Sequence, residues 1–394
     1  MRQVLWPLFA TTLIQSLVAM AQLVVPVLAP AIAPDIGVST EDVGLYSGVM
    51  FLATTLFSLI TGSLVLRFGG VRLGQFGLLL SVVALLASAS GQLPLLAAGA
   101  VLIGLGYGPS TPAGSHILAR FSPPHLRNVV FSIKQAGSPL GGLLAGAVLP
   151  TLAIAYGWRA AMLLAALACL LALIAVQPLR RHLDDDRRPD RRILADGLFA
   201  GLRVLREAPA LQRMCFCTFW YAVMQMAIWT YLTVILVERV GLSLVQAGLA
   251  FSCMQVSGVS ARILWGWVAD RLGRGRQVIG WLGLVTALGG LVAAELDARW
   301  SFVAVIAFII PYGACSSGWN GVFLAEIARL APPGRIGPAT SGVIFFTYLG
   351  VFAGPLLFHA IVSGSGGYSA GFYALAAMTA LAALTLLRLP EKPA

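Results

Sequence analysis

The sequence GWVADRLGRGR at residues 266–276 decides the fold, because the chain carries a second, altered copy of it nearer the N-terminus. The earlier copy, at residues 62–72, reads GSLVLRFGGVR. With Gly62 aligned to Gly266, three further positions match between the copies: Arg67 with Arg271, Gly69 with Gly273, and Arg72 with Arg276. Each copy is a short basic turn that follows a long apolar stretch. A repeated turn of this kind predicts two halves with the same topology.

The composition places these halves in a membrane. Hydrophobic residues make up 59% of the 394 residues and charged residues 10%, with a mean hydropathy of +0.88. A soluble domain must wet its surface and does not use that much apolar sequence. Each apolar span is near or above the roughly 20 residues that cross the hydrocarbon as a helix. We count twelve spans, at residues 4–33, 43–66, 72–90, 93–118, 128–154, 158–178, 213–237, 245–268, 276–294, 299–327, 339–362 and 368–389. We therefore predict an all-α membrane protein with twelve transmembrane helices in two pseudo-symmetric six-helix bundles.

One long connection divides the chain. We expect an N-terminal six-helix bundle at residues 1–178, a cytoplasmic linker at 179–212 and a C-terminal six-helix bundle at 213–394. The linker carries the acidic run Asp184–Asp186. Because these acids lie among arginines that neutralise them, we interpret the run as part of a solvated linker rather than as a metal site.

The formal net charge of +11 follows the membrane topology. With the N-terminus placed in the cytoplasm, only Arg159, Arg239 and Arg299 fall in outer loops, which is the positive-inside bias. We expect a multi-pass protein of the cytoplasmic (inner) membrane, with both termini in the cytoplasm and no nucleic-acid partner. The five cysteines are scattered through apolar segments, and no catalytic grouping or phosphate loop is evident. We expect no metal, no cofactor and no enzymatic activity.

The loop at 266–276 strongly resembles the signature of the major facilitator superfamily, and the plan of six plus six spans covers the whole chain. The resemblance implies that Asp270, Arg271, Gly273 and Arg274 latch the two halves during alternating access. The earlier copy has Leu66 in place of the aspartate, so a latch in that half must be weaker or differently built.

A glycine pattern in the fifth span resembles a second element of that superfamily. The sequence Gly137-Ser-Pro139-Leu-Gly141-Gly142 matches its G-x-P-x-G-G element, and Gly137 and Gly141 recur as Gly350 and Gly354. Small residues let helices approach closely and proline permits bending, so we expect a packing or hinge role. Together with the turn residues Arg67, Gly69 and Arg72, these positions are our candidates for gating.

Two basic residues, Lys134 and Arg262, lie inside the fifth and eighth spans. A charge in hydrocarbon costs roughly 3 kcal/mol on insertion scales, so it persists only beside a polar cavity or partner. No acid is evident at similar depth, which favours an anionic ligand. Arg262 resembles the eighth-span arginine that binds the substrate carboxylate in monocarboxylate and oxalate carriers. Oxalate-type carriers add an eleventh-span lysine, where this chain has Thr347, so the second cation would be Lys134. The alternative for Arg262 is that it reaches the nearby membrane surface or packs against the loop of Asp270.

The superfamily resemblance implies that the first, fourth, seventh and tenth spans line a central cavity. Polar and aromatic side chains there can orient a small ligand, although each is individually more typical of a helix–helix contact. Our further candidates for substrate binding are Gln15, Tyr107, Tyr221, Gln225, Trp229, Trp319 and Asn320. For proton coupling the candidates are Glu326 and Glu238, and the alternative for Glu326 is a surface ion pair with Arg329.

We therefore expect a secondary active transporter that moves a small, monocarboxylate-like organic anion across the membrane by alternating access and is linked to protons. Its expected partners are the anion, the proton and the lipid bilayer, and we expect a monomer. The alternative is a proton-driven efflux antiporter for drugs or hydrophobic metabolites. The aromatic seventh span favours that alternative, whereas the embedded cations and the lack of a central acid weigh against it.

Overall fold

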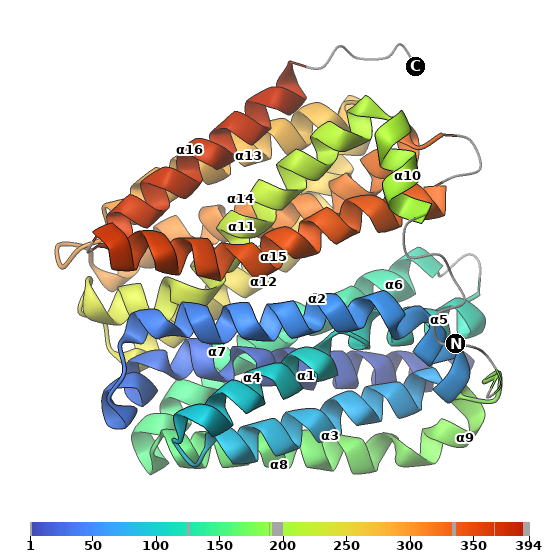
Figure 1. Cartoon of the computed structure of the whole chain (residues 1–394), viewed down its shortest axis with the longest axis horizontal. Helices are drawn as coiled ribbons and strands as arrows, with labels where there is room; N and C mark the ends of the chain where they lie inside the picture. The colour runs from blue at the N-terminus through green and yellow to red at the C-terminus, as the bar shows by residue number, and fades with distance from the viewer. Residues whose placement is uncertain are drawn as a thin grey trace. The chain divides into compact units, whose positions relative to one another are not determined.

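A computed structural model describes residues 2–123, 127–188, 190, 200–332, 336–365 and 367–388. All regular secondary structure in these residues is helical (Figure 1). Eleven helical stretches among them are long and apolar enough to cross a membrane. The remaining predicted span is occupied by α2 (Val43–Phe68), a helix of 26 residues. The predicted all-helical membrane fold is confirmed.

The chain divides into two compact units. Unit 1 comprises Met1–Gly197 with Ser243–Ser252, and unit 2 comprises Leu198–Leu242 with Cys253–Ala394. The first boundary falls inside the predicted linker. The second assigns the first turns of α12 (Leu244–Leu272) to unit 1 and the rest of that helix to unit 2. The two units are described separately below.

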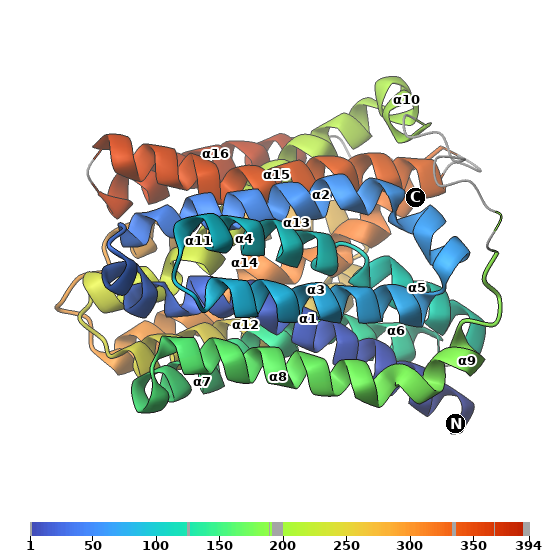
Figure 2. The same cartoon turned by 60° about the horizontal axis from the view of Figure 1, so that its bottom comes forward.

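Unit 1 is built around its first helix. Here α1 (Arg2–Ile36) packs against α7 (Gly137–Tyr156) and α8 (Trp158–Val176), and α3 (Gly70–Ser88) lies beside α8 (Figure 2). Glycines permit these close approaches: a Cβ atom on Gly141 would overlap the backbone of Ser16 in α1. Close backbone contact without large side chains is how membrane helices gain packing energy.

Two of the predicted spans in unit 1 are broken helices. The fourth span consists of α4 (Leu93–Tyr107) and α5 (Ser110–Phe121), which are separated at Gly108 and Pro109. The fifth consists of α6 (Arg127–Gln135) and α7, which are separated at Ala136. Pro109 lacks the backbone N–H that would continue the hydrogen-bond ladder of the fourth span. Pro139 lies in the first turn of α7, where the missing N–H costs little.

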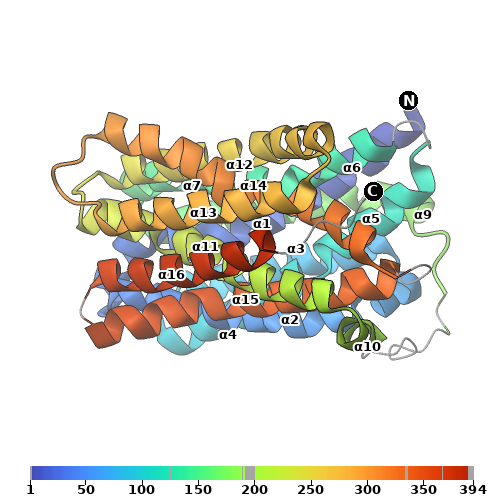
Figure 3. The same ribbon diagram turned by 90° about the horizontal axis from the view of Figure 1, so that it is seen from above.

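Unit 2 is built in the same way around its own first long helix. It contains α10 (Ala200–Glu207), α11 (Pro209–Glu238), α13 (Gly275–Ala294), α14 (Phe302–Leu330), α15 (Ile336–Ser365) and α16 (Tyr368–Leu387). Helix α11 packs against α15, and α13 against α16 (Figure 3). Cβ atoms on Gly350 and Gly354 of α15 would overlap the backbone of α11. The echoing glycine pairs therefore press against the corresponding helix of their own units.

The predicted linker is more ordered than we expected. Residues 177–183 form η3 (Gln177–Leu179) and α9 (Arg180–Leu183), while α10 packs Val204 and Leu205 into the core of unit 2. Asp184 is only 6% exposed. The prediction that the acidic run is solvated is therefore wrong for Asp184. Residues 189 and 191–199 of the linker lie outside the described residues.

Candidate substrate site

Lys134 is buried completely inside unit 1. Its side chain is 0% exposed, and its Nζ donates hydrogen bonds to the backbone oxygen of Thr111 (3.0 Å) and to Oε1 of Gln135 (3.1 Å). A Cβ atom on Gly114 would lie 2.8 Å from the Lys134 Cε, so glycine at this position leaves room for the lysine stem. None of the ion pairs in the described part of the chain includes Lys134. The ammonium is thus held by neutral oxygens.

The contact of Lys134 with Thr111 lies beside both helix breaks. Lys134 lies in the last turn of α6, where a cation interacts favourably with the helix dipole, and Thr111 lies in the first turn of α5. Broken helices supply polar backbone groups at membrane depth, which secondary transporters use to bind ions and substrates. A continuous apolar pattern hides such breaks, so sequence periodicity alone placed Lys134 within one long helix.

Thr111 also connects Lys134 to α1. The Nε2 of Gln15 lies 3.5 Å from the Thr111 Oγ1, at the limit of a hydrogen bond, and the buried Gln15 Oε1 has no partner among the described residues. Nearby in sequence, the Tyr107 hydroxyl and the Ser138 Oγ lie 3.2 Å apart and join α4 to α7. Gln135 and Ser138 were not among our candidates, although they adjoin Lys134 and the glycine pattern in sequence.

In unit 2 the predicted polar residues converge on one serine of α14. The Nε of Arg262 donates to the backbone oxygen of Ser317 (3.3 Å), and the Nδ2 of Asn320 donates to the same oxygen (3.2 Å). Gln225 of α11 donates from Nε2 to the Ser317 Oγ (3.4 Å). Ser317 was not among the candidates, because an isolated serine in an apolar helix carries no pattern.

Two aromatic candidates lie in the core of unit 2. The Tyr221 hydroxyl donates to the backbone oxygen of Ile279 (3.1 Å), and the Trp319 indole donates to that of Ser316 (3.0 Å). Their rings contact each other edge to face, with centroids 5.8 Å apart. Both side chains are almost fully buried in the core of unit 2, and their role in substrate binding stays a prediction. Trp229 differs: it is buried, and its indole N–H has no hydrogen-bond partner in the described ranges.

The acidic candidates lie near helix ends. Glu326 is only 3% exposed and makes two hydrogen bonds with Arg329, at 2.7 and 3.0 Å. Its Oε2 would be 3.2 Å from a Cβ on Gly275, at the start of α13. The ion pair with Arg329 therefore exists, but its carboxylate is buried rather than on the surface. Glu238 is exposed at the end of α11 and accepts a hydrogen bond from the Tyr368 hydroxyl (2.9 Å).

The repeated turns share one backbone feature. Gly69 and Gly273 both have positive φ, +97° and +62°, a conformation that favours glycine over other residues. Asp270 is exposed, and Arg271 lies over the ring of Trp267 at 5.3 Å from its centroid. In the described structure, the start of α13 is approached by the carboxylate of Glu326, which the sequence analysis did not anticipate.

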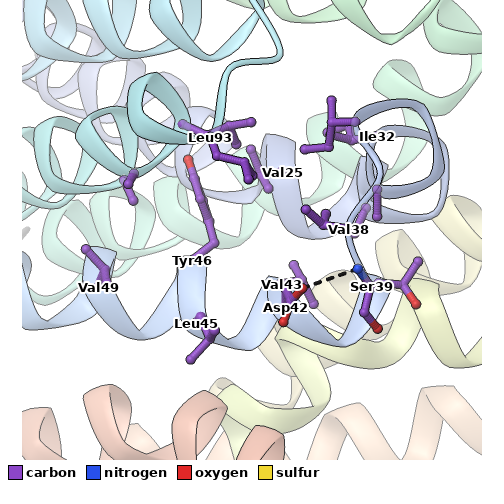
Figure 4. Close-up of a pocket in the computed structure, with 17 residues that line it drawn as sticks. Val25, Ile32, Val38, Ser39, Asp42, Val43, Leu45, Tyr46, Val49 and Leu93 are labelled. Carbon is purple, nitrogen blue, oxygen red and sulfur yellow. Dashed lines mark hydrogen bonds between the residues drawn. The ribbon is translucent and has the colours of Figure 1, made fainter.

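A separate cavity of about 380 Å³ in unit 1 contains none of the candidate residues (Figure 4). Aliphatic side chains such as Val25, Ile32 and Leu93 line it, with Tyr46 and Asp42 as its main polar groups. The candidate residues instead form two separate groups, around Thr111 in unit 1 and around Ser317 in unit 2. The predicted clamp of Lys134 and Arg262 combines one residue from each unit, and it stays a prediction.

The model of the Major Facilitator Superfamily matches residues 9–211 and 214–394 of this sequence. The chain belongs to this superfamily. It is 23% identical to a probable hexose phosphate transport protein of Chlamydia trachomatis, covering 91% of this chain and 84% of that protein. It is 22% identical to the hexuronate transporter of Bacillus subtilis, covering 91% and 88%. A crystal structure of a peptide transporter matches with a TM-score of 0.78 at 18% identity, covering 97% of this chain and 93% of that one.

Membership of the Major Facilitator Superfamily accounts for the general plan of the chain. It is a multi-pass membrane protein of a transporter family. The loop at 266–276 carries the sequence resemblance to the superfamily signature. The structural match supports the fold alone.

Proposed function

We propose that the protein is a proton-linked carrier of small, monocarboxylate-like organic anions in the cytoplasmic membrane. One observation carries the proposal: Lys134 is fully buried, and in the described residues its ammonium contacts only neutral oxygens. A buried ammonium loses its hydration, and two hydrogen bonds to neutral acceptors only partly replace it. A carboxylate about 4 Å away would contribute about 4 kcal/mol at an effective dielectric constant of roughly 20.

Unit 2 would supply the second set of donors. The bond from the Arg262 Nε to the Ser317 oxygen fixes the guanidinium against α14, with the amides of Gln225 and Asn320 on the same serine. Guanidinium and amide N–H groups are the donors that suit carboxylates, and the planar guanidinium can bind both oxygens. We infer that these residues orient an anion during alternating access, with Gly137, Pro139 and Gly141 forming part of the moving helices.

The relatives support an anionic substrate. The two named above are described as transporters of hexuronate and of hexose phosphate, and both compounds are anions. Identity of 22–23% does not transfer either substrate to this chain, but it makes a small anion the expected class. The excess of basic residues in the predicted inner loops supports an orientation with both termini in the cytoplasm.

For proton coupling, we propose Glu326. It is a buried carboxylate, and its partner Arg329 has a side chain that is 47% exposed and can therefore move away. Separation of the pair would leave an uncompensated buried charge, so movement of Arg329 would change the electrostatic environment of the carboxylate. Glu238 is the second candidate, because it is the last residue of α11 and its side chain is exposed.

The alternative function, efflux of drugs or hydrophobic metabolites, is favoured by one observation. The buried indole N–H of Trp229 has no partner in the part of the chain that the structure describes, so a ligand that accepts a hydrogen bond beside an aromatic ring would satisfy it. Substitution of Trp229 by Phe separates the two functions: it would impair transport of an aromatic ligand and would leave lactate transport nearly unchanged.

Uptake into proteoliposomes tests the main proposal. Labelled lactate, benzoate and glucuronate would be offered under an inward proton gradient to the wild type and to Lys134→Gln and Arg262→Gln. Arg299→Gln is the matched control, because it also removes one positive charge but from an outer position that is 86% exposed. We expect uptake of at least one anion, loss of it in both site variants and no change in the control. Normal uptake by both site variants would refute the anion site.

A further inference from the structure

The acidic run of the linker is bound to the end of unit 1 that carries the first repeated turn. The carboxylate of Asp184 accepts hydrogen bonds from the backbone N–H groups of Val71 (2.8 Å) and Arg72 (3.0 Å), in the first turn of α3. The first N–H groups of a helix have no partner within the helix, and the helix dipole favours a negative charge there. Asp184 therefore caps α3 from a position more than 100 residues away in sequence.

The next two aspartates bind the end of α5. Arg120 forms ion pairs with Asp185 and, at 2.6 Å, with Asp186. His116 Nε2 and the Asp186 Oδ2 lie 2.7 Å apart. Arg120 holds the pKa of Asp185 below its usual range, so this carboxyl remains charged. These pairs are partly exposed and can dissociate more easily than the contact of Asp184.

A backbone hydrogen bond extends the docked segment beyond the three aspartates. The backbone N–H of Arg188 donates to the backbone oxygen of Leu66 (2.7 Å), at the end of α2. Leu66 is the position at which the second copy of the turn has Asp270. A Cβ atom on Gly69 would overlap the Asp184 carboxylate, so glycine at that position is needed for docking as well as for the turn.

The far end of the linker is held by unit 2, where Val204 and Leu205 of α10 are buried in the core. The predicted linker covers 179–212, but along the chain only residues 189–199 lie between the two anchors. A fully extended chain from residue 188 to residue 200, twelve residues further on, would reach at most roughly 40 Å. If the segment detached as far back as the end of α8, the connection between the units would contain about twice as many residues.

We propose that residues 184–188 form a detachable latch, which binds the start of α3 through Asp184 and controls the movement between the two units. Asp184 places a carboxylate at the start of α3, where it accepts two backbone hydrogen bonds. Leu66 in the preceding turn has no charge and cannot do this. Residues 189–199 connect the segment to unit 2 along the chain, so a movement of unit 2 beyond their reach would pull on the segment. Release begins with the exposed pairs of Arg120 and ends with Asp184. The latch is independent of the ligand that the protein carries.

Limited proteolysis of the full-length protein in liposomes tests the docking. Trypsin cleaves after Arg187 only when the segment detaches, whereas the bond after Arg188 resists trypsin because proline follows it. At low protease the rate of cleavage follows the open population. We expect Asp184→Ala to raise cleavage there about tenfold or more, as loss of charge-assisted hydrogen bonds predicts. Asp190→Asn, which removes an exposed acid just beyond the latch, should cleave like the wild type. Equal cleavage in Asp184→Ala and wild type would overturn the docking.

Spin labels test the effect on movement without any substrate. Labels would replace Leu5 in unit 1 and Leu272 in unit 2, which are 55% and 59% exposed. We expect Asp184→Ala to broaden the distance distribution between the labels, and Asp190→Asn to leave it unchanged. Arg120→Gln is the second variant, because it weakens the latch without altering α3. If both variants raise trypsin cleavage yet leave the distance distribution unchanged, the segment is only a structural support and the latch is refuted. Failure of anion uptake would not affect these readings.

Discussion

Replacement of Lys134 by methionine distinguishes a ligand-binding cation from a structural one. Methionine keeps the apolar stem that fills the space beside Gly114 and removes the ammonium. If Lys134 only stabilised the fold, loss of its two hydrogen bonds would lower the free energy of unfolding by about 3–6 kcal/mol, since a bond from a charged group contributes about 1.5–3 kcal/mol. If Lys134 is a ligand-binding cation, its replacement removes the free-energy cost of burying the ammonium. The stability of the ligand-free protein should then be unchanged or higher.

The expected effect on binding follows from the same geometry. A carboxylate about 4 Å from the ammonium gains about 4 kcal/mol at an effective dielectric constant of roughly 20, and each 1.4 kcal/mol is a factor of about ten in affinity. The upper bound is therefore about a thousandfold. Because the anion also loses its hydration, we expect Lys134→Met to weaken binding by about a hundredfold.

Thermal unfolding in detergent measures both quantities in one assay. The midpoint without ligand reports stability, and its rise with lactate, benzoate or glucuronate reports affinity. We expect an unchanged or higher midpoint and little rise with the anions, while Arg299→Gln behaves as the wild type in both respects. A lower midpoint with anion-dependent stabilisation intact would refute the reasoning, because it would make Lys134 structural.

Three further predictions use single substitutions. Gly114→Ala should displace the Lys134 side chain and impair anion uptake while the protein stays folded, as judged by its elution as a single species. Gly141→Ala should lower the free energy of unfolding by about 1–3 kcal/mol through overpacking against α1. Gly266→Ala is its control in the same thermal assay. It should be neutral or slightly stabilising, because nothing lies within 4 Å of the new Cβ. Glu326→Gln should abolish uptake driven by a pH gradient and preserve exchange of labelled for unlabelled anion; if driven uptake survives, Glu326 is not the coupling group.

The large features of the fold could be predicted because each depends on local sequence. Apolar spans and basic turns set the membrane topology, and the glycine pairs of the fifth and eleventh spans indicated equivalent helices. The contacts of these pairs, Gly141 with α1 and Gly354 with α11, agree with that indication. The helix break at Pro109 was missed because hydrophobicity continues across it, even though proline is the physical cause.

The candidate site was only partly predictable, because its geometry depends on contacts between distant segments. Lys134 and Arg262 stand out as charges in apolar sequence, but their partners Thr111 and Ser317 offer mainly backbone oxygens, which every residue has. The role of Asp184 was misread for the same reason. Its acceptor function depends on the start of α3, which no local pattern connects with the linker.

The central claim is that a negative charge on the ligand is recognised, and competition between matched acids and amides tests it most directly. Lactate and lactamide, benzoate and benzamide, and glucuronate and glucuronamide differ in charge far more than in shape. Each would be measured as a competitor of labelled anion uptake by the wild type in proteoliposomes. The account predicts that the acid of at least one pair competes and that its amide does not, by a factor of about a hundred. Equal competition by acid and amide in every pair would contradict it.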